Sequence, residues 1–204
     1  SMFRFMQEAA VAHVMRLGLG PKDVHARQQS WVITQMLVEL EALPPLHSRV
    51  TVETWSNGAP LQCAQREHII RDEKGNRLLS ACSYWLLFDR RQNKLVKISD
   101  IFPPKDERER QSALNRRPKR VATPLPSTIT SDYLTRHSDL DFNGHVNHIR
   151  YIEQALDLIP TSLRESHRLR ELELNFLRES LLSDGLQSQL AQVSDLPVFQ
   201  HVLL

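Results

Sequence analysis

Residues 138–148 read Ser-Asp-Leu-Asp-Phe-Asn-Gly-His-Val-Asn-His, and this polar turn runs directly into a helical pattern of apolar residues. We predict a helix from about His145 to Ile159, because apolar side chains recur there every three or four residues, and Pro160 helps to end it. The residues that set this spacing are Val146, Ile149, Ile152, Leu156 and Ile159.

Antiparallel strands are predicted on both sides of this helix. One strand lies near 128–136, and the alternation of leucines with glutamates around Leu172 and Leu174 predicts another. The turn Ser183-Asp184-Gly185 then leads into two further strands, near 186–193 and 197–203. The second part of the chain therefore reads as one helix followed by a meander of strands.

The first part of the chain repeats this plan. Apolar residues between Phe3 and Leu17 share one helix face, and Gly18 and Gly20-Pro21 stop the helix. Four strands follow, near 38–42, 50–54, 61–71 and 78–89. We therefore predict the α+β class, with two units in tandem, each a long helix packed on a curled antiparallel sheet. The repeat is one of architecture and not of sequence.

A basic, proline-rich stretch separates the two parts. Five of the eleven prolines fall between 103 and 126, and seven basic residues stand against three acidic ones between 105 and 120. We divide the chain into 1–104, a linker over 105–126, and 127–204. The linker charge has two interpretations: a solvated connector, or a patch that attracts an acidic partner.

Composition excludes several classes. The net charge is +2, with 41% hydrophobic and 25% charged residues, and no apolar run is long enough to span a bilayer. No secretory signal and no glycine-rich phosphate-binding motif is visible. Cys63 and Cys82 have neither a disulfide framework nor a metal-ligand spacing. We expect a protein of the bacterial cytoplasm, or of the plastid stroma if the source is a plant, with no membrane insertion, no cofactor and no bound metal.

The turn at 138–148 concentrates groups that can do chemistry. Backbone N–H groups at a helix start favour developing negative charge, and His145 can exchange a proton near neutral pH. Asp141 and Asn143 can equally cap the helix or fold the turn. Metal binding is the weakest alternative, since the histidines and aspartates lack a dedicated spacing. The residues that it would use are His137, Asp139, His145 and His148.

These residues carry a family resemblance. The run from Asp141 to Asn147, with Arg150-Tyr151-Ile152 after it, resembles the D-x-N-x-H-V-N motif of acyl-acyl-carrier-protein (acyl-ACP) thioesterases. Glu171 to Ser180 is similar to the family strand that ends in arginine, glutamate and often cysteine. Segments of the first part also resemble the family, in the same order along the chain. They are Phe5–Ala10, Trp31–Thr34, Val52–Trp55, Tyr84-Trp85 and Lys97-Ile98.

The resemblance implies two hotdog domains in tandem and hydrolysis of an acyl-ACP thioester, which releases free fatty acid during fatty acid biosynthesis. It implies an acyl-chain site in 1–104 and catalytic residues in 127–204: Asp141, Asn143, His145 and Glu179. Asn143 and a helix-start N–H would hold the oxyanion. Glu179, with His145, would activate water, and Asp141 would fix the geometry. Ser180 replaces the family cysteine, which favours direct attack by water over an acyl-enzyme.

The resemblance also indicates a partner. Acyl carrier proteins are acidic, so the linker offers candidate docking residues: Arg116, Arg117, Lys119 and Arg120. Two alternatives remain open, an acyl-coenzyme A thioesterase and a hotdog protein that binds acyl groups without hydrolysis. Nucleic-acid binding is disfavoured, because aromatic residues make up only 6% of the chain and no zinc spacing occurs. We expect each part to be short of an outer strand, and a homodimer that covers the open edges.

Overall fold

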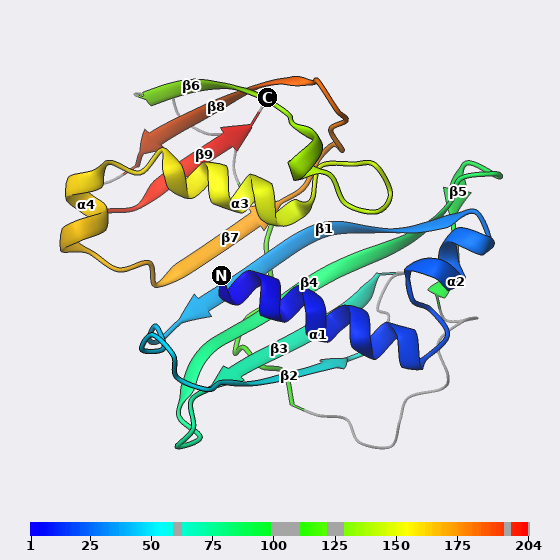
Figure 1. The fold of residues 1–204 in the computed structure, drawn as a ribbon, viewed down its shortest axis with the longest axis horizontal. Coiled ribbons are helices and arrows are strands. Elements are labelled where there is room, and N and C mark those ends of the chain that lie inside the picture. The colour runs from blue at the N-terminus through cyan, green and yellow to red at the C-terminus, as the bar shows by residue number, and fades with distance from the viewer. Residues whose placement is uncertain (59–62, 99–110, 122–128, 194–196, 204) are drawn as a thin grey trace. The chain divides into compact units, whose positions relative to one another are not determined.

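The computed structural model describes residues 1–58, 63–98, 111–121, 129–193 and 197–203. The chain forms two compact units, shown in Figure 1. The first unit combines 1–120 with Leu169–Phe176, and the second combines Val121–Arg168 with Leu177–Leu204. Both contain helices and antiparallel sheet, so the predicted α+β class is confirmed.

The first unit is a helix on a six-stranded sheet. Helix α1 (Met2–Arg16) lies across one face of the sheet, and the short α2 (Pro21–Ala26) follows it. The strand order is β2-β3-β4-β1-β7, with β5 added to β4. The strands are β1 (Gln29–Leu40), β2 (Thr51–Ser56), β3 (Ala64–Arg71), β4 (Arg77–Asp89), β5 (Lys94–Leu95) and β7 (Glu171–Asn175).

Residues 111–121, here called the connecting segment, contact the outer face of this sheet, which is the face opposite α1. Leu114 packs with Leu37 of β1 and Cys82 of β4, and all three are buried. The Ala113 N–H donates to a carboxylate oxygen of Glu67, which is fully buried on β3, at 3.1 Å. Residues 113–114 are thus part of the core of the first unit. The interpretation of this region as a solvated connector does not hold for Ala113 and Leu114, while residues 99–110 and 122–128 lie outside the described part of the chain.

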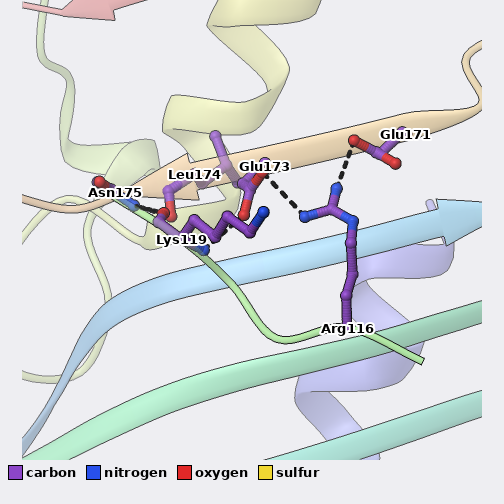
Figure 2. A network of polar contacts seen from close by, with 6 residues as sticks. All are labelled: Arg116, Lys119, Glu171, Glu173, Leu174 and Asn175. Carbon is purple, nitrogen blue, oxygen red and sulfur yellow. Dashed lines mark hydrogen bonds and ion pairs between the residues drawn. The ribbon is translucent and has the colours of Figure 1, made fainter. Parts of the chain in front are cut away.

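Strand β7 holds the connecting segment in place, as Figure 2 shows. The Arg116 guanidinium forms ion pairs with Glu171 at 2.5 Å and with Glu173 at 3.1 Å. Glu173 also accepts the Lys119 N–H at 2.6 Å, and the Asn175 amide donates to the Lys119 carbonyl at 3.0 Å. Three alternate residues of one strand, which share one face, therefore fix residues 116–119.

The position of β7 differs from the sequence-based expectation. The alternating pattern around 172–174 predicted a strand of the second part, but β7 pairs antiparallel with β1 in the first sheet. Leu172 and Leu174 stand opposite Val38 and Met36, so apolar side chains match on the face toward α1. The strand itself is correctly predicted; its partner is a strand more than 130 residues earlier in the sequence.

The second unit has a smaller sheet in the order β6-β8-β9, with α3 packed against β8 and β9. Ile149 and Ile152 of α3 and Leu190 of β8 are buried. None of the described helices in either unit is long and apolar enough to cross a membrane. The elements are β6 (Ile129–Leu134), a 3₁₀ turn (His137–Asp139), α3 (His148–Asp157), α4 (Thr161–Ser166), β8 (Gly185–Gln192) and β9 (Phe199–Leu203).

Helix α3 begins three residues later than predicted. Its N-cap is Asn147, whose side-chain oxygen accepts the Ile149 N–H at 3.0 Å. An asparagine cap satisfies a backbone donor that the helix leaves free, so the helix starts after it. His145 therefore lies in the turn before the helix and not within its first turn.

The Arg116 pairs give a testable prediction on stability. We expect Arg116→Met to lower the free energy of unfolding by about 1 kcal/mol, because both ion pairs are partly exposed. The loss should shrink at high salt, which screens these pairs in the wild type. Chemical denaturation with and without added salt measures both effects. Arg120→Met, on the exposed end of the same segment, is the matched control, and equal losses in the two variants would contradict the assignment.

Candidate active site

The turn at 136–147 is organised around the buried carboxylate of Asp139, which is 4% exposed. It accepts hydrogen bonds from the Tyr133 hydroxyl and from the Arg136 N–H, the latter at 2.7 Å, and it lies 3.4 Å from the Arg150 guanidinium. The Asp139 carbonyl also accepts the Asn147 N–H at 2.8 Å. These contacts connect β6, the turn and α3, so Asp139 has a structural role.

Asp141 folds the next part of the turn. One of its carboxylate oxygens accepts the N–H groups of Asn143 at 2.8 Å and His145 at 3.3 Å. Its own N–H donates to the His145 carbonyl at 2.7 Å. Gly144 has φ = 78°, a left-handed conformation that glycine adopts without steric cost. Asp141 thus holds the backbone on both sides of His145.

His145 and Glu179 lie side by side. The Nε2 atom of His145 is 3.2 Å from a carboxylate oxygen of Glu179. The imidazole is 19% exposed and the carboxylate 48% exposed, so this pair is open to water on the glutamate side. An imidazole and a carboxylate in contact can orient a water molecule and move its proton.

The backbone of Ser180 brings Glu179 to this place. The Ser180 carbonyl accepts the Val146 N–H at 2.9 Å, and the Ser180 N–H donates to the Tyr151 hydroxyl at 3.1 Å. Burial raises the pKa of that hydroxyl, and the neighbouring Glu179 charge raises it further, so Tyr151 stays protonated. Two anchors from the turn and from α3 therefore fix the residue directly after Glu179.

The Asn143 amide is left available. It is partly exposed, and its side chain makes no hydrogen bond to another residue in the described part of the chain. Its backbone, in contrast, is fixed by Asp141. An amide on a rigid turn, two residues from His145, can donate to an oxygen of a bound molecule.

Among the described residues, no group of histidine, cysteine, aspartate and glutamate side chains is arranged to hold a metal ion. Of the residues considered for a metal, Asp139 is engaged as described and His145 faces Glu179. Burial lowers the pKa of His148 to about 4, so it is neutral at pH 7.

The four predicted catalytic residues occupy one short region of the second unit. The sequence did not indicate the supporting contacts of Tyr133, Asp139 and Tyr151. Tyr151 is part of the motif quoted for the family resemblance, but its hydroxyl contact with Ser180 depends on the fold. Arg150 likewise belongs to that motif, and it pairs with Asp139 and with Glu153.

Comparison with known proteins identifies the family of this chain. The model of the acyl-ACP thioesterase N-terminal domain matches residues 1–103, and that of the C-terminal domain matches residues 123–203. The chain belongs to the acyl-ACP thioesterase family.

Three relatives illustrate the likeness. A chloroplastic dodecanoyl-[acyl-carrier-protein] hydrolase of Cinnamomum camphora is 26% identical over 92% of this chain and 53% of its own length. The 12:0-ACP thioesterase of Umbellularia californica has the same fold, with a TM-score of 0.80 at 22% identity, over 95% of this chain and 80% of that one. An acyl-ACP thioesterase of Bacteroides thetaiotaomicron has a TM-score of 0.74 at 26% identity, over 95% and 79%. The chain spans about half the length of the curated relatives that it matches.

Two histidines of the second unit lead us to predict that the fold is less stable at acidic pH. Burial lowers the pKa values of His148 and His201 to about 4, whereas an unfolded histidine titrates near about 6.5. Between these values the unfolded chain binds protons that the folded chain does not, so stability falls as the pH falls. We expect a loss of at most about 2 kcal/mol per histidine between pH 7 and pH 5, because pH 5 lies about 1.5 units below the unfolded pKa.

Denaturant unfolding at the two pH values tests this prediction. His148→Gln should reduce the loss, because glutamine does not titrate. His137→Gln, on the exposed 3₁₀ turn, is the matched control. An unaltered pH dependence in His148→Gln would contradict the assignment.

Proposed function

We propose that this protein hydrolyses the thioester between a fatty acyl chain and acyl carrier protein, and so releases free fatty acid. The observation that carries the proposal is the 3.2 Å contact of His145 with Glu179, in a turn that also contains Asn143. Family membership supports the same chemistry. We further propose that the first part of the chain, 1–104, binds the acyl chain and that 127–204 supplies the catalytic groups.

We assign stabilisation of the oxyanion chiefly to the Asn143 amide. At the start of α3, the Ile149 N–H is capped by the Asn147 side chain and the Arg150 N–H by the Asn147 carbonyl. These helix-start donors are therefore occupied, while the Asn143 amide has no partner among the described residues. A hydrogen bond donated to the carbonyl oxygen stabilises the negative charge that develops there.

Glu179 is the general base. Its carboxylate is 48% exposed and can contact water, while His145 orients it from the buried side. Water attacks the thioester carbon, and its proton passes to Glu179. The C–S bond then breaks, the acid leaves, and the carrier thiolate takes a proton through His145. Asp141 holds His145 in place through the backbone contacts described above.

Direct attack by water is favoured over an acyl-enzyme. Ser180 is only 5% exposed, and its backbone is anchored by Val146 and Tyr151. A serine nucleophile needs access to the substrate and a neighbouring base. Glu179 has the greater access.

The docking hypothesis becomes narrower. Arg116 already forms ion pairs with Glu171 and Glu173, so it is not counted among the docking residues. The side chains of Arg117, Lys119 and Arg120 are exposed on a segment that β7 holds in place. We propose these three as the contact for an acidic carrier protein. A homodimer and a cytoplasmic location stay predictions.

The catalytic assignment predicts a large loss of activity in Glu179→Gln. Since a general base contributes about 100-fold or more, kcat on an acyl-ACP substrate should fall by about that factor with little change in KM. Ser180→Ala should stay near wild type. Glu165→Gln, an exposed position on α4, serves as the control. Full activity in Glu179→Gln, or a collapse in Ser180→Ala alone, would overturn the mechanism.

The carrier assignment predicts a charge effect that depends on the substrate. Lys119→Glu combined with Arg120→Glu should lower kcat/KM for acyl-ACP by about tenfold at low salt, because steering by charge is lost. The same variant should treat the matched acyl-coenzyme A thioester as the wild type does. Lys22→Glu, exposed on α2, is the control. Better turnover of the coenzyme A thioester by the wild type would favour the alternative carrier, and saturable binding without turnover would favour a binding protein.

A further inference from the structure

The position of Glu179 depends on the residues that directly follow it. Residues 177–179 are exposed and belong to no helix or strand. Their backbone N–H groups donate no hydrogen bond to another described residue. Ser180, in contrast, is 5% exposed and is anchored through its backbone by Val146 and Tyr151. The segment after Glu179 therefore determines where its carboxylate lies.

Thr135 holds the turn at 181–184, which continues this segment. It directly follows β6 and is 2% exposed. Its hydroxyl donates a hydrogen bond to the Leu181 carbonyl at 2.6 Å. Its backbone N–H donates to the Asp184 carbonyl at 3.0 Å, and its carbonyl accepts the Ser183 N–H at 3.4 Å. One buried residue thus contacts three of the four residues of the turn.

The turn at 181–184 needs such support. Ser183 has φ = 67°, a left-handed conformation that is unfavourable for a residue with a side chain. Such a residue keeps this conformation only where the surrounding contacts impose it. Within the turn, the Leu181 N–H donates to the Asp184 carboxylate at 2.8 Å. The remaining support comes from Thr135.

Thr135 is also the first fixed residue of the turn that carries His145. The next residue along the chain is Arg136, whose N–H donates to the buried Asp139 carboxylate at 2.7 Å. The two sides of the candidate catalytic pair are therefore both connected to Thr135. His145 is connected through the turn at 136–147, and Glu179 is connected through Leu181.

Resting on the proposed function, we propose that the Thr135 hydroxyl is a positioning group that keeps Glu179 in contact with His145. The hydroxyl touches no reacting atom, and it acts through the Leu181 carbonyl, two residues after Glu179. Without this hydrogen bond, residues 179–181 can move away from His145, and the 3.2 Å contact is lost. The rate then falls, because a general base must meet the attacking water in one particular geometry.

Substitutions at Thr135 test the role of the hydroxyl. Thr135→Val keeps the shape of the side chain and both backbone hydrogen bonds, and it removes only the donor to Leu181. We expect kcat on an acyl-ACP substrate to fall by about tenfold with KM unchanged, because the base is displaced and the substrate contacts are not. Thr135→Ser retains the hydroxyl and should restore most of this loss.

Thr130→Val is the matched control, since Thr130 lies at an exposed position of the same strand. Equal losses of kcat in Thr135→Ser and Thr135→Val would show that the methyl group matters and not the hydroxyl, and would overturn the inference. The melting temperature of Thr135→Val should fall by about 2–4 °C, as for the loss of one hydrogen bond in a chain of this size. A larger decrease together with a raised KM would assign Thr135 to the fold alone.

A double-mutant cycle separates positioning from a general effect on the protein. If Thr135 acts through Glu179, Thr135→Val should cause no further loss of kcat in the Glu179→Gln background. Losses that multiply would mean that Thr135 acts independently of Glu179, which contradicts the inference.

The outcomes also separate the inference from the function on which it rests. If the wild type hydrolyses acyl-ACP and Thr135→Val matches it, the inference fails and the function stands. If the wild type hydrolyses no thioester, the proposed function fails, and crystal structures of the variants decide the inference. A separation of His145 and Glu179 beyond hydrogen-bond distance in Thr135→Val, but not in Thr135→Ser, supports it; an unchanged separation in Thr135→Val overturns it.

Discussion

The candidate active site depends on one buried carboxylate. Asp139 accepts hydrogen bonds from Tyr133 of β6 and from the backbone of the turn, and it pairs with Arg150 of α3. Removing one partner from a buried charged network leaves the others unsatisfied. The loss of any one of these contacts therefore weakens the rest. The turn that follows, with Asp141 and His145, can therefore keep one conformation although it is partly exposed. Catalytic side chains need such a rigid backbone, because small displacements of the reacting groups reduce the rate strongly.

Local features of the fold follow from the sequence, and non-local ones do not. Periodicity predicted α1, α3 and most strands, since each depends on side chains a few positions apart. The pairing of β7 with β1 depends on residues far apart in the chain, and an alternating leucine pattern fits either sheet. The start of α3 was misplaced because Asn147, and not an earlier polar residue, caps the helix. The same holds for the candidate site. The motif indicated His145, whereas the contacts of Tyr151 and Val146 with Ser180, which place Glu179, could be seen only in the fold.

Charge in the connecting segment serves more than one purpose. From composition alone, the basic residues between 105 and 120 look equivalent. In the structure Arg116 is paired with two glutamates of β7, whereas Arg117 and Arg120 remain at the surface. The partner of a charged side chain, and not the charge itself, determines whether it stabilises the fold or is available to a ligand.

The position of β7 gives the chain an interlocked connectivity. The polypeptide leaves the first unit near Arg120, builds β6 and α3 of the second, returns to the first for Leu169–Phe176, and then completes the second with β8 and β9. Cutting the polypeptide at one position therefore cannot separate the two units. A fragment that stops before β7 would expose the hydrogen-bonding edge of β1 and release the anchor of Arg116, and exposed edges invite aggregation. Gene fragments or domain exchanges within such a chain must therefore carry β7 with the first half, although it is encoded in the second.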